Sequence, residues 1–245
     1  MNDTQTSEVA AVDSAVNQRR RFAFSFDRNF WVGPCVFFVY RWLVLPAGTL
    51  LFLLHPPASY RIAINYGPSL AFLLLMFFWH RRFFADSISF VGDFRRRDFL
   101  IGAVAISLLY IATNGIAVAI HQPREPLMAG LFQSLTPLGV CVLIISLVAL
   151  PPIVEELAFR HFLMAPFPFR KSTAWSSVAV ITTAVWFTVV HPYIYLTSDV
   201  TIFIMGVILG VARVRSHGML LPMCLHAYSI CFALLADWIR SSHGL

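Results

Sequence analysis

The chain has 245 residues, of which 58% are hydrophobic and 12% are charged, and its mean hydropathy is +0.74. Soluble domains carry about 25% charged residues, so this composition excludes an ordinary soluble protein and predicts a chain that lies in a membrane. The net charge of +6 does not indicate nucleic-acid binding, because the basic residues stand in short clusters beside apolar runs, as they do where they set membrane topology.

The chain is predicted to divide into a tail and one membrane domain. Residues 1–28 are expected to form a disordered cytoplasmic tail, because the chain starts with a polar stretch that lacks the basic residues of a cleavable signal peptide. Residues 29–245 are expected to form a single all-α domain, a polytopic transmembrane helical bundle of about seven spans, with six to eight as the range. The apolar runs lie at about 30–54, 64–79, 99–120, 133–167, 173–191, 199–214 and 219–239.

The fourth run is longer than a membrane span. A straight helix over 134–167 would be roughly 50 Å long, whereas the hydrocarbon core of a bilayer is ~30 Å thick. Proline removes a helical hydrogen bond, so Pro151 and Pro152 are predicted to kink this helix.

Two other features of the runs bear on packing. Gly206 and Gly210 in the sixth run form a GxxxG pattern, which favours close approach of neighbouring helices. Arg41 lies inside the first run, where such a side chain either extends its charge to the membrane surface or pairs with an acid. The sequence leaves both alternatives open for Arg41.

Basic residues predict the orientation of the bundle. With a cytoplasmic N-terminus, most of the 18 lysines and arginines fall in inside segments, whereas Arg61, Arg124 and Arg240 fall outside. Cytoplasmic segments of multi-pass proteins carry the excess of Lys and Arg. We therefore expect the N-terminus in the cytoplasm, and the compact chain favours a prokaryotic inner membrane.

The fourth run contains a charged cluster, Glu155, Glu156 and Arg160. A charge near the centre of a bilayer costs roughly 2.5 to 3.5 kcal/mol on insertion scales, so such residues are rare and usually functional. Glu156 and Arg160 are four residues apart with the acid first, the favourable order for an ion pair on one helix face. Glu155 then remains free for chemistry. The alternative is an ion-pair network that only fixes helix packing.

Two histidines in later runs are candidate partners of Glu155. His191 ends the fifth run, and His226 lies inside the seventh. Counted along straight helices at 1.5 Å per residue, Glu155 and His191 meet in the outer half of the bilayer, whereas His226 lies deeper and needs a tilted or shorter helix to join them. His161 points about 120° away from Glu155 on an α-helix, so it is left out of the site.

A glutamate and two histidines in a cavity that admits water indicate hydrolysis. The carboxylate takes a proton from water that one histidine holds, and the second histidine donates to the oxyanion that forms on the attacked carbonyl. The same trio is also a ligand set for zinc with water as a further ligand. Both routes suit cleavage of a peptide bond.

These motifs resemble those of a known family of glutamic-type intramembrane proteases, the CPBP family (CaaX protease and bacteriocin-processing, also called Abi). The resemblance covers about 134–235, the expected catalytic core. The first motif of the family, EExxxR, is matched by Glu155, Glu156 and Arg160, and the second, FxxxH, by Phe187 and His191. The third is matched by the region from Phe203 to Gly210 and the Leu-His-Ala at 225–227.

The resemblance implies an integral membrane endopeptidase that cleaves a protein or peptide tail at the membrane. It assigns water activation to Glu155 and His191 and the oxyanion to His226, with Glu156 and Arg160 in supporting roles. The metal-free mechanism, with no cofactor, is favoured over zinc because the spans offer few other ligands. Candidate substrates are prenylated CaaX-type tails, bacteriocin leaders and C-terminal sorting tags.

One position departs from the family pattern. The third motif has Asn or Asp four residues after its histidine, and here that residue is Ile230, which neither donates nor accepts a hydrogen bond. The site then uses another donor beside His226, or the protein is a non-catalytic membrane scaffold or regulator of the same family. A small transporter with Glu155 in a proton relay is a third alternative, and the internal repeats that would favour it are not visible in the sequence.

Overall fold

The structure is a computed structural model that describes residues 28–83 and 89–244. Within these two ranges the chain forms helices and loops and no strands, which confirms the predicted all-α fold. The expected tail, except for Arg28, lies outside the described residues. Arg28 already belongs to the first helix.

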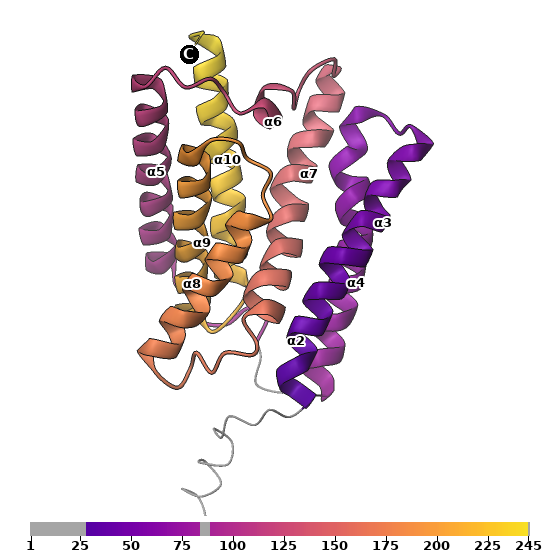
Figure 1. Cartoon of the computed structure of the whole chain (residues 1–245), viewed down its shortest axis with the longest axis vertical. Helices are drawn as coiled ribbons and strands as arrows, with labels where there is room; N and C mark the ends of the chain where they lie inside the picture. Colours follow the sequence, from indigo (N-terminus) through magenta and orange to yellow (C-terminus); the bar gives the residue numbers. More distant parts are fainter. Residues whose placement is uncertain (1–27, 84–88, 245) are drawn as a thin grey trace, which may run out of the picture.

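The N-terminal part consists of two antiparallel spans that lie on one side of the molecule (Figure 1). The first contains α2 (Arg28–Val39), a π-helical turn η1 (Tyr40–Val44), α3 (Leu45–Leu50) and a 3-10 turn η2 (Leu51–Leu54). The second contains a 3-10 turn η3 (Ala58–Tyr60) and α4 (Arg61–Phe83). Arg41, in η1, holds its guanidinium over the ring of Trp42, 5.2 Å from the centroid. No ion pair of Arg41 with an acid is present within the described ranges.

The remaining helices follow with short connections. They are α5 (Arg96–Ala119), the single turn α6 (Pro126–Ala129), α7 (Pro137–Glu156), a π-helical segment η4 (Leu157–Leu163), α8 (Thr173–Val189), α9 (Leu196–Ser216) and α10 (Leu220–Ser242). In the described part, six helical stretches are long and apolar enough to cross a membrane, and α8, with 17 residues, is a shorter apolar helix. A membrane span needs about 20 apolar residues. The protein is therefore a multi-pass membrane protein.

The helix of the fourth run changes its winding after the two prolines. Pro151 and Pro152 lie inside α7, which continues to Glu156. The chain then forms the seven-residue π-helix η4, all of whose residues are buried. A π-helix pairs residues five apart, and such segments are rare and often occur at functional sites. The winding therefore changes directly after the two glutamates and not at the prolines.

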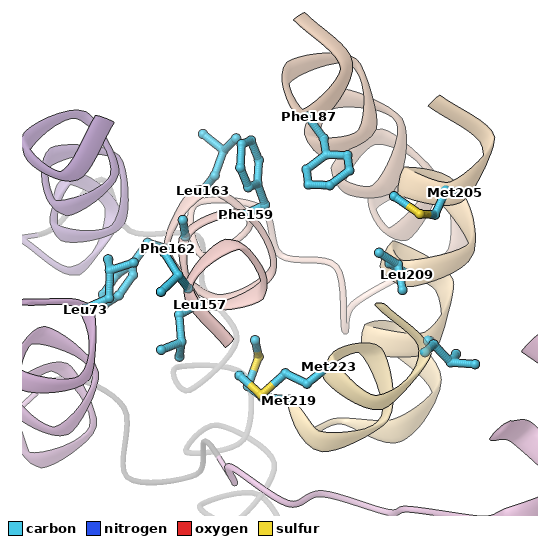
Figure 2. Close-up of a cluster of buried hydrophobic side chains, with 14 of the residues drawn as sticks. Leu73, Leu157, Phe159, Phe162, Leu163, Phe187, Met205, Leu209, Met219 and Met223 are labelled. Carbon is cyan, nitrogen blue, oxygen red and sulfur yellow. The ribbon is translucent and has the colours of Figure 1, made fainter. Parts of the chain in front are cut away.

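Helix α7 with η4 lies between the N-terminal spans and the other helices (Figure 1). It packs against α4 on one side and α10 on the other, and η4 contacts α2 and α8. Figure 2 shows the buried side chains along this axis, where Phe159 of η4 meets Phe187 of α8 with ring centroids 5.1 Å apart. Leu157 and Phe162 are fully buried in the same cluster.

The GxxxG pattern brings α9 close to α8, as predicted. A Cβ atom on Gly206 would lie 3.1 Å from Ala184, and one on Gly210 would lie 3.0 Å from Val180. Real Cβ atoms rarely come this close to another heavy atom. The small residues therefore allow the two backbones to approach, and the carbonyl of Gly206 becomes reachable by side chains of η4.

Candidate active site

Glu155 lies at the end of α7, where α4, α8 and α10 converge. Its side chain is 8% exposed. One carboxylate oxygen, Oε1, accepts a hydrogen bond of 2.6 Å from the hydroxyl of Tyr66 on α4. The other, Oε2, lies 3.8 Å from Nε2 of His191 and 3.8 Å from Nε2 of His226. The structure thus brings the three predicted catalytic residues together around one oxygen atom.

The second ring nitrogen of each histidine is held by a fixed partner. Nδ1 of His191 lies 2.5 Å from the carbonyl oxygen of Phe187, one turn earlier in the chain. Nδ1 of His226 lies 2.9 Å from Oε1 of Glu156. A carbonyl or carboxylate oxygen accepts, so in both rings Nδ1 carries a proton, an assignment that rests on the partners. Each ring therefore turns Nε2 towards Glu155.

The distances around Glu155 suit a bridging water molecule. A separation of 3.8 Å is too long for a direct hydrogen bond, and groups at such a distance are commonly connected through water. Oε2 lies at this distance from the Nε2 atoms of both His191 and His226. A water molecule there can donate one proton to the carboxylate and the other to a histidine.

Glu156 links the histidine of α10 to the buried arginine. The predicted pair with Arg160 is present, with Nε of Arg160 3.3 Å from Oε2 of Glu156, and both side chains are inaccessible to solvent. Arg160 also donates from Nη2 to the carbonyl of Gly206 at 3.1 Å, and its guanidinium lies over the ring of Phe187. The pair was expected from the spacing, but the bond from Glu156 to His226 was not.

Both histidines reach the carboxylate of Glu155. His191 and His226 lie equally far from Oε2 of Glu155. Helix counting along straight, upright spans placed Glu155 and His191 in the outer half of the bilayer and His226 deeper, so that His226 needed a tilted or shorter helix to join them. Helix α8 has only 17 residues and runs obliquely across the bundle (Figure 1), so its C-terminal end reaches the middle of the molecule.

His161 belongs to a different contact. Its Nε2 lies 3.0 Å from Nδ1 of His80 on α4, and its ring packs edge-on against Phe77. Because η4 is π-helical, the angle counted for an α-helix does not apply at His161. The two rings connect α4 to η4 away from Glu155.

Tyrosines near Glu155 were not identified from the sequence. Tyr66 is 89 residues away in the chain, and neither its neighbours nor its spacing point to the motif. Tyr193 follows His191 by two residues and stacks on it, with centroids 5.9 Å apart and ring planes 4° from parallel. Burial, together with the carboxylates of Glu155 and Glu125, raises the pKa of Tyr193 to about 12. The position beside His191 was the one available signal for Tyr193.

A cavity of about 110 Å³ adjoins the site behind Tyr193. Its wall is formed by the C-terminal half of α5, the start of α9 and the end of α10, with α6 and its preceding loop above. Tyr110 and Tyr193 line it together with Asn114, Glu125 and Asp237. Asp237 forms an ion pair of 2.6 Å with Arg124. The cavity provides a partly polar space next to the catalytic cluster.

The donor set was also tested for a metal ion. Glu155, His191 and His226 are the side chains that the zinc alternative would use, and within residues 28–83 and 89–244 no group of three His, Cys, Asp or Glu side chains is placed to hold a metal. All four cysteines are free thiols.

Comparisons with known proteins agree with this arrangement. Residues 137–231 match the family model of type II CAAX prenyl endopeptidase Rce1-like proteins. A 24.3 kDa uncharacterized protein of Escherichia coli is 31% identical over 187 residues, which cover 75% of this chain and 84% of the relative. No solved structure matches. The chain belongs to the Rce1-like family of CAAX proteases, the CPBP family.

Proposed function

We propose that the protein is a glutamic-type intramembrane endopeptidase that cleaves a membrane-associated protein or peptide tail. The observation that supports this proposal best is the convergence of Glu155, His191 and His226 on one point in a buried site. Membership of the Rce1-like family supports a protease. Glu155 comes from α7 and His226 from α10, and His191 lies just after the end of α8.

Glu155 acts as the general base. Water between Oε2 of Glu155 and Nε2 of His191 gives a proton to the carboxylate, and its oxygen attacks the carbonyl carbon of the peptide bond. Glu155 then passes this proton to the amine nitrogen as the carbon–nitrogen bond breaks, and both electrons of that bond stay with the nitrogen. A positioned acid–base group contributes typically 10²- to 10⁴-fold in rate.

His226 stabilises the oxyanion. With protons on both nitrogens, His226 donates from Nε2 to the oxygen of the tetrahedral intermediate, and Glu156, bonded to Nδ1 at 2.9 Å, carries the counter-charge. Arg160 holds Glu156 from the other side. Loss of one donor to an oxyanion costs about 10²- to 10³-fold in rate. Glu156 and Arg160 are therefore positioning residues for His226.

The location of the protein follows from its charge distribution. The end of α4, the start of α5, the α7–α8 connection and the end of α9 lie at one end of the bundle (Figure 1). Most of the basic residues in the described ranges are found there, including Arg95, Arg170 and Arg215. This asymmetry supports a cytoplasmic face at that end, with the N-terminus on the same side. The prokaryotic inner membrane stays a prediction from the compact chain.

The experiment measures cleavage by the purified protein in lipid nanodiscs. The probes are a farnesylated peptide that ends in a CAAX sequence and a panel of tagged single-span membrane proteins with different C-terminal tails, read by mass spectrometry. Wild-type protein is expected to cleave at least one probe, and Glu155→Gln to reduce the rate at least 10³-fold. Asp98→Asn, which makes the same change in a surface ion pair with Arg215, is the control and is expected to retain activity.

Two outcomes would contradict the proposal. Cleavage that persists in Glu155→Gln would show that Glu155 is not the general base. Cleavage that is lost on treatment with a strong chelator and restored by zinc removes the metal-free version.

A second candidate is a non-catalytic scaffold of the same family, which Ile230 favours. Four residues after His226, this apolar side chain supplies no hydrogen bond, and the hydroxyl of neighbouring Ser229 is directed to the carbonyl of His226 at 2.8 Å. A folded wild-type protein that cleaves no probe, but is recovered from membranes with a stoichiometric partner protein, would support the scaffold.

A further inference from the structure

We propose that Tyr66 is a positioning residue that orients the carboxylate of Glu155 for general-base catalysis. This inference rests on the proposed protease function. Tyr66 lies five residues after the start of α4, outside the segment 137–231 that matches the family model. The proposal therefore gives the N-terminal spans a role in the active site.

The hydrogen bond between the two residues is short and buried. The phenol donates to Oε1 of Glu155 at 2.6 Å, a distance typical of hydroxyl donors to ionised carboxylates, which form some of the stronger hydrogen bonds in proteins. A carboxylate in an apolar interior needs such donors, since its charge has lost the hydration that it has in water. Tyr66 supplies one.

The bond also fixes which oxygen is available for chemistry. With Oε1 bonded to Tyr66, Oε2 is the atom that faces His191 and His226, at 3.8 Å from each Nε2. Without the phenol, the terminal torsion of a glutamate is broad, and the carboxylate can rotate away from the point where water is held. A misplacement of about 1 Å is enough to reduce a rate by about 10²-fold.

Other groups around Glu155 do not replace Tyr66. Arg160 is paired with Glu156, and the ion pairs of Glu155 in the described part of the chain are those with the two histidines. The ring of Tyr193 stacks on the ring of His191. Among the described hydroxyl groups, Tyr66 is the one with a hydrogen bond to the Glu155 carboxylate.

The first test compares two removals of a tyrosine hydroxyl. Tyr66→Phe is expected to reduce kcat 10- to 100-fold and to leave KM within about 3-fold, with the farnesylated CAAX peptide or the cleaved panel member as probe. Tyr228→Phe is the matched control, because it deletes a half-buried hydroxyl that is 2.7 Å from Ser107, on the α5–α10 contact. The control is expected to keep kcat within about 2-fold. Equal loss of kcat in both variants would overturn the proposal.

The second test needs no activity. The thermal midpoints of wild type, Tyr66→Phe, Glu155→Met and the double variant form a double-mutant cycle. If the hydroxyl acts on the carboxylate, Tyr66→Phe lowers the midpoint in the wild-type background and not in Glu155→Met. An equal shift in both backgrounds would show that Tyr66 only packs against α7, and would overturn the inference.

The two tests separate this inference from the proposed function. Absence of cleavage by the wild-type protein overturns the protease and the positioning role together, whereas the thermal cycle still reports on the bond. Cleavage that needs Glu155 but keeps its full kcat in Tyr66→Phe overturns the role of Tyr66 alone.

Discussion

The C-terminal helices and the N-terminal helices differ in how much of their surface is buried inside the protein. In α9, 44% of the residues in the most apolar stretch are buried inside the protein, and 33% in the spans that contain α7 and α10, against 22% and 17% in the two N-terminal spans. The buried charges Glu155, Glu156 and Arg160 lie in α7 and η4, and Arg213 lies in α9. Charged groups in a bilayer need protein partners, so the helices that carry the chemistry must also surround it. The N-terminal spans mostly face outward and contribute Tyr66.

The helices are thus of two kinds: apolar helices that lie against lipid, and helices that surround a polar interior. The segment that matches the family model, 137–231, coincides with the second kind. Changes in the buried network, in the close helix contact and in the loop after α8 test this difference.

Removal of the buried arginine is expected to have the largest effect on stability. Arg160→Met removes the buried guanidinium from Glu156 and leaves His226 as its remaining partner, and breaking a buried pair costs about 3 to 5 kcal/mol. Arg215→Met removes a surface pair with Asp98 at 2.8 Å, which is expected to cost less than about 1 kcal/mol. Denaturant unfolding in mild detergent measures both. Similar losses in the two variants would show that the interior network adds no more than a surface pair.

Filling the contact between α8 and α9 is expected to have an intermediate effect. Gly206→Leu places a side chain against Ala184, 3.1 Å from the position of a Cβ atom, and displaces the carbonyl that Arg160 uses. Overpacking of this kind costs about 1 to 3 kcal/mol. Gly115→Leu on α5, where a Cβ meets nothing within 4 Å, is the control. If both variants unfold at the wild-type denaturant concentration, the close approach is not needed.

Removal of the Tyr193 hydroxyl, in the loop after α8, is expected to have the smallest effect on stability. This effect depends on pH. The folded protein raises the pKa of Tyr193 from 10.0 to about 12. Between pH 10 and 12 the phenol of Tyr193 therefore stays neutral in the folded protein, whereas it is already ionised in the unfolded chain. Stability is therefore complete below pH 10 and falls by about 1 to 2 kcal/mol as the pH rises towards 12. Tyr193→Phe should lose less than wild type over that interval in thermal unfolding. Tyr60→Phe, which removes an exposed phenol, should follow wild type.

The helical class, the pair of Glu156 with Arg160 and the close contact at Gly206 were predictable, because each depends on composition or on spacing within one helix. The set of Glu155, His191 and His226 was also predictable, since charged and imidazole groups are conspicuous in apolar runs. The contact of His226 with Glu156 was not, because its two partners lie on different helices whose relative height depends on packing. The same holds for Tyr66, a residue type that is common in membrane helices for other reasons.

The sequence by itself determined that this protein crosses the membrane several times and that few of its charged side chains lie within the spans, because the free energies of hydrocarbon burial and of charge transfer act on each residue separately. Only the tertiary structure decided that α8 is short and oblique, that η4 is π-helical, and that Tyr66 from α4 bonds to Glu155. These features arise from how whole helices fit against one another, and no local pattern of residues records that fit.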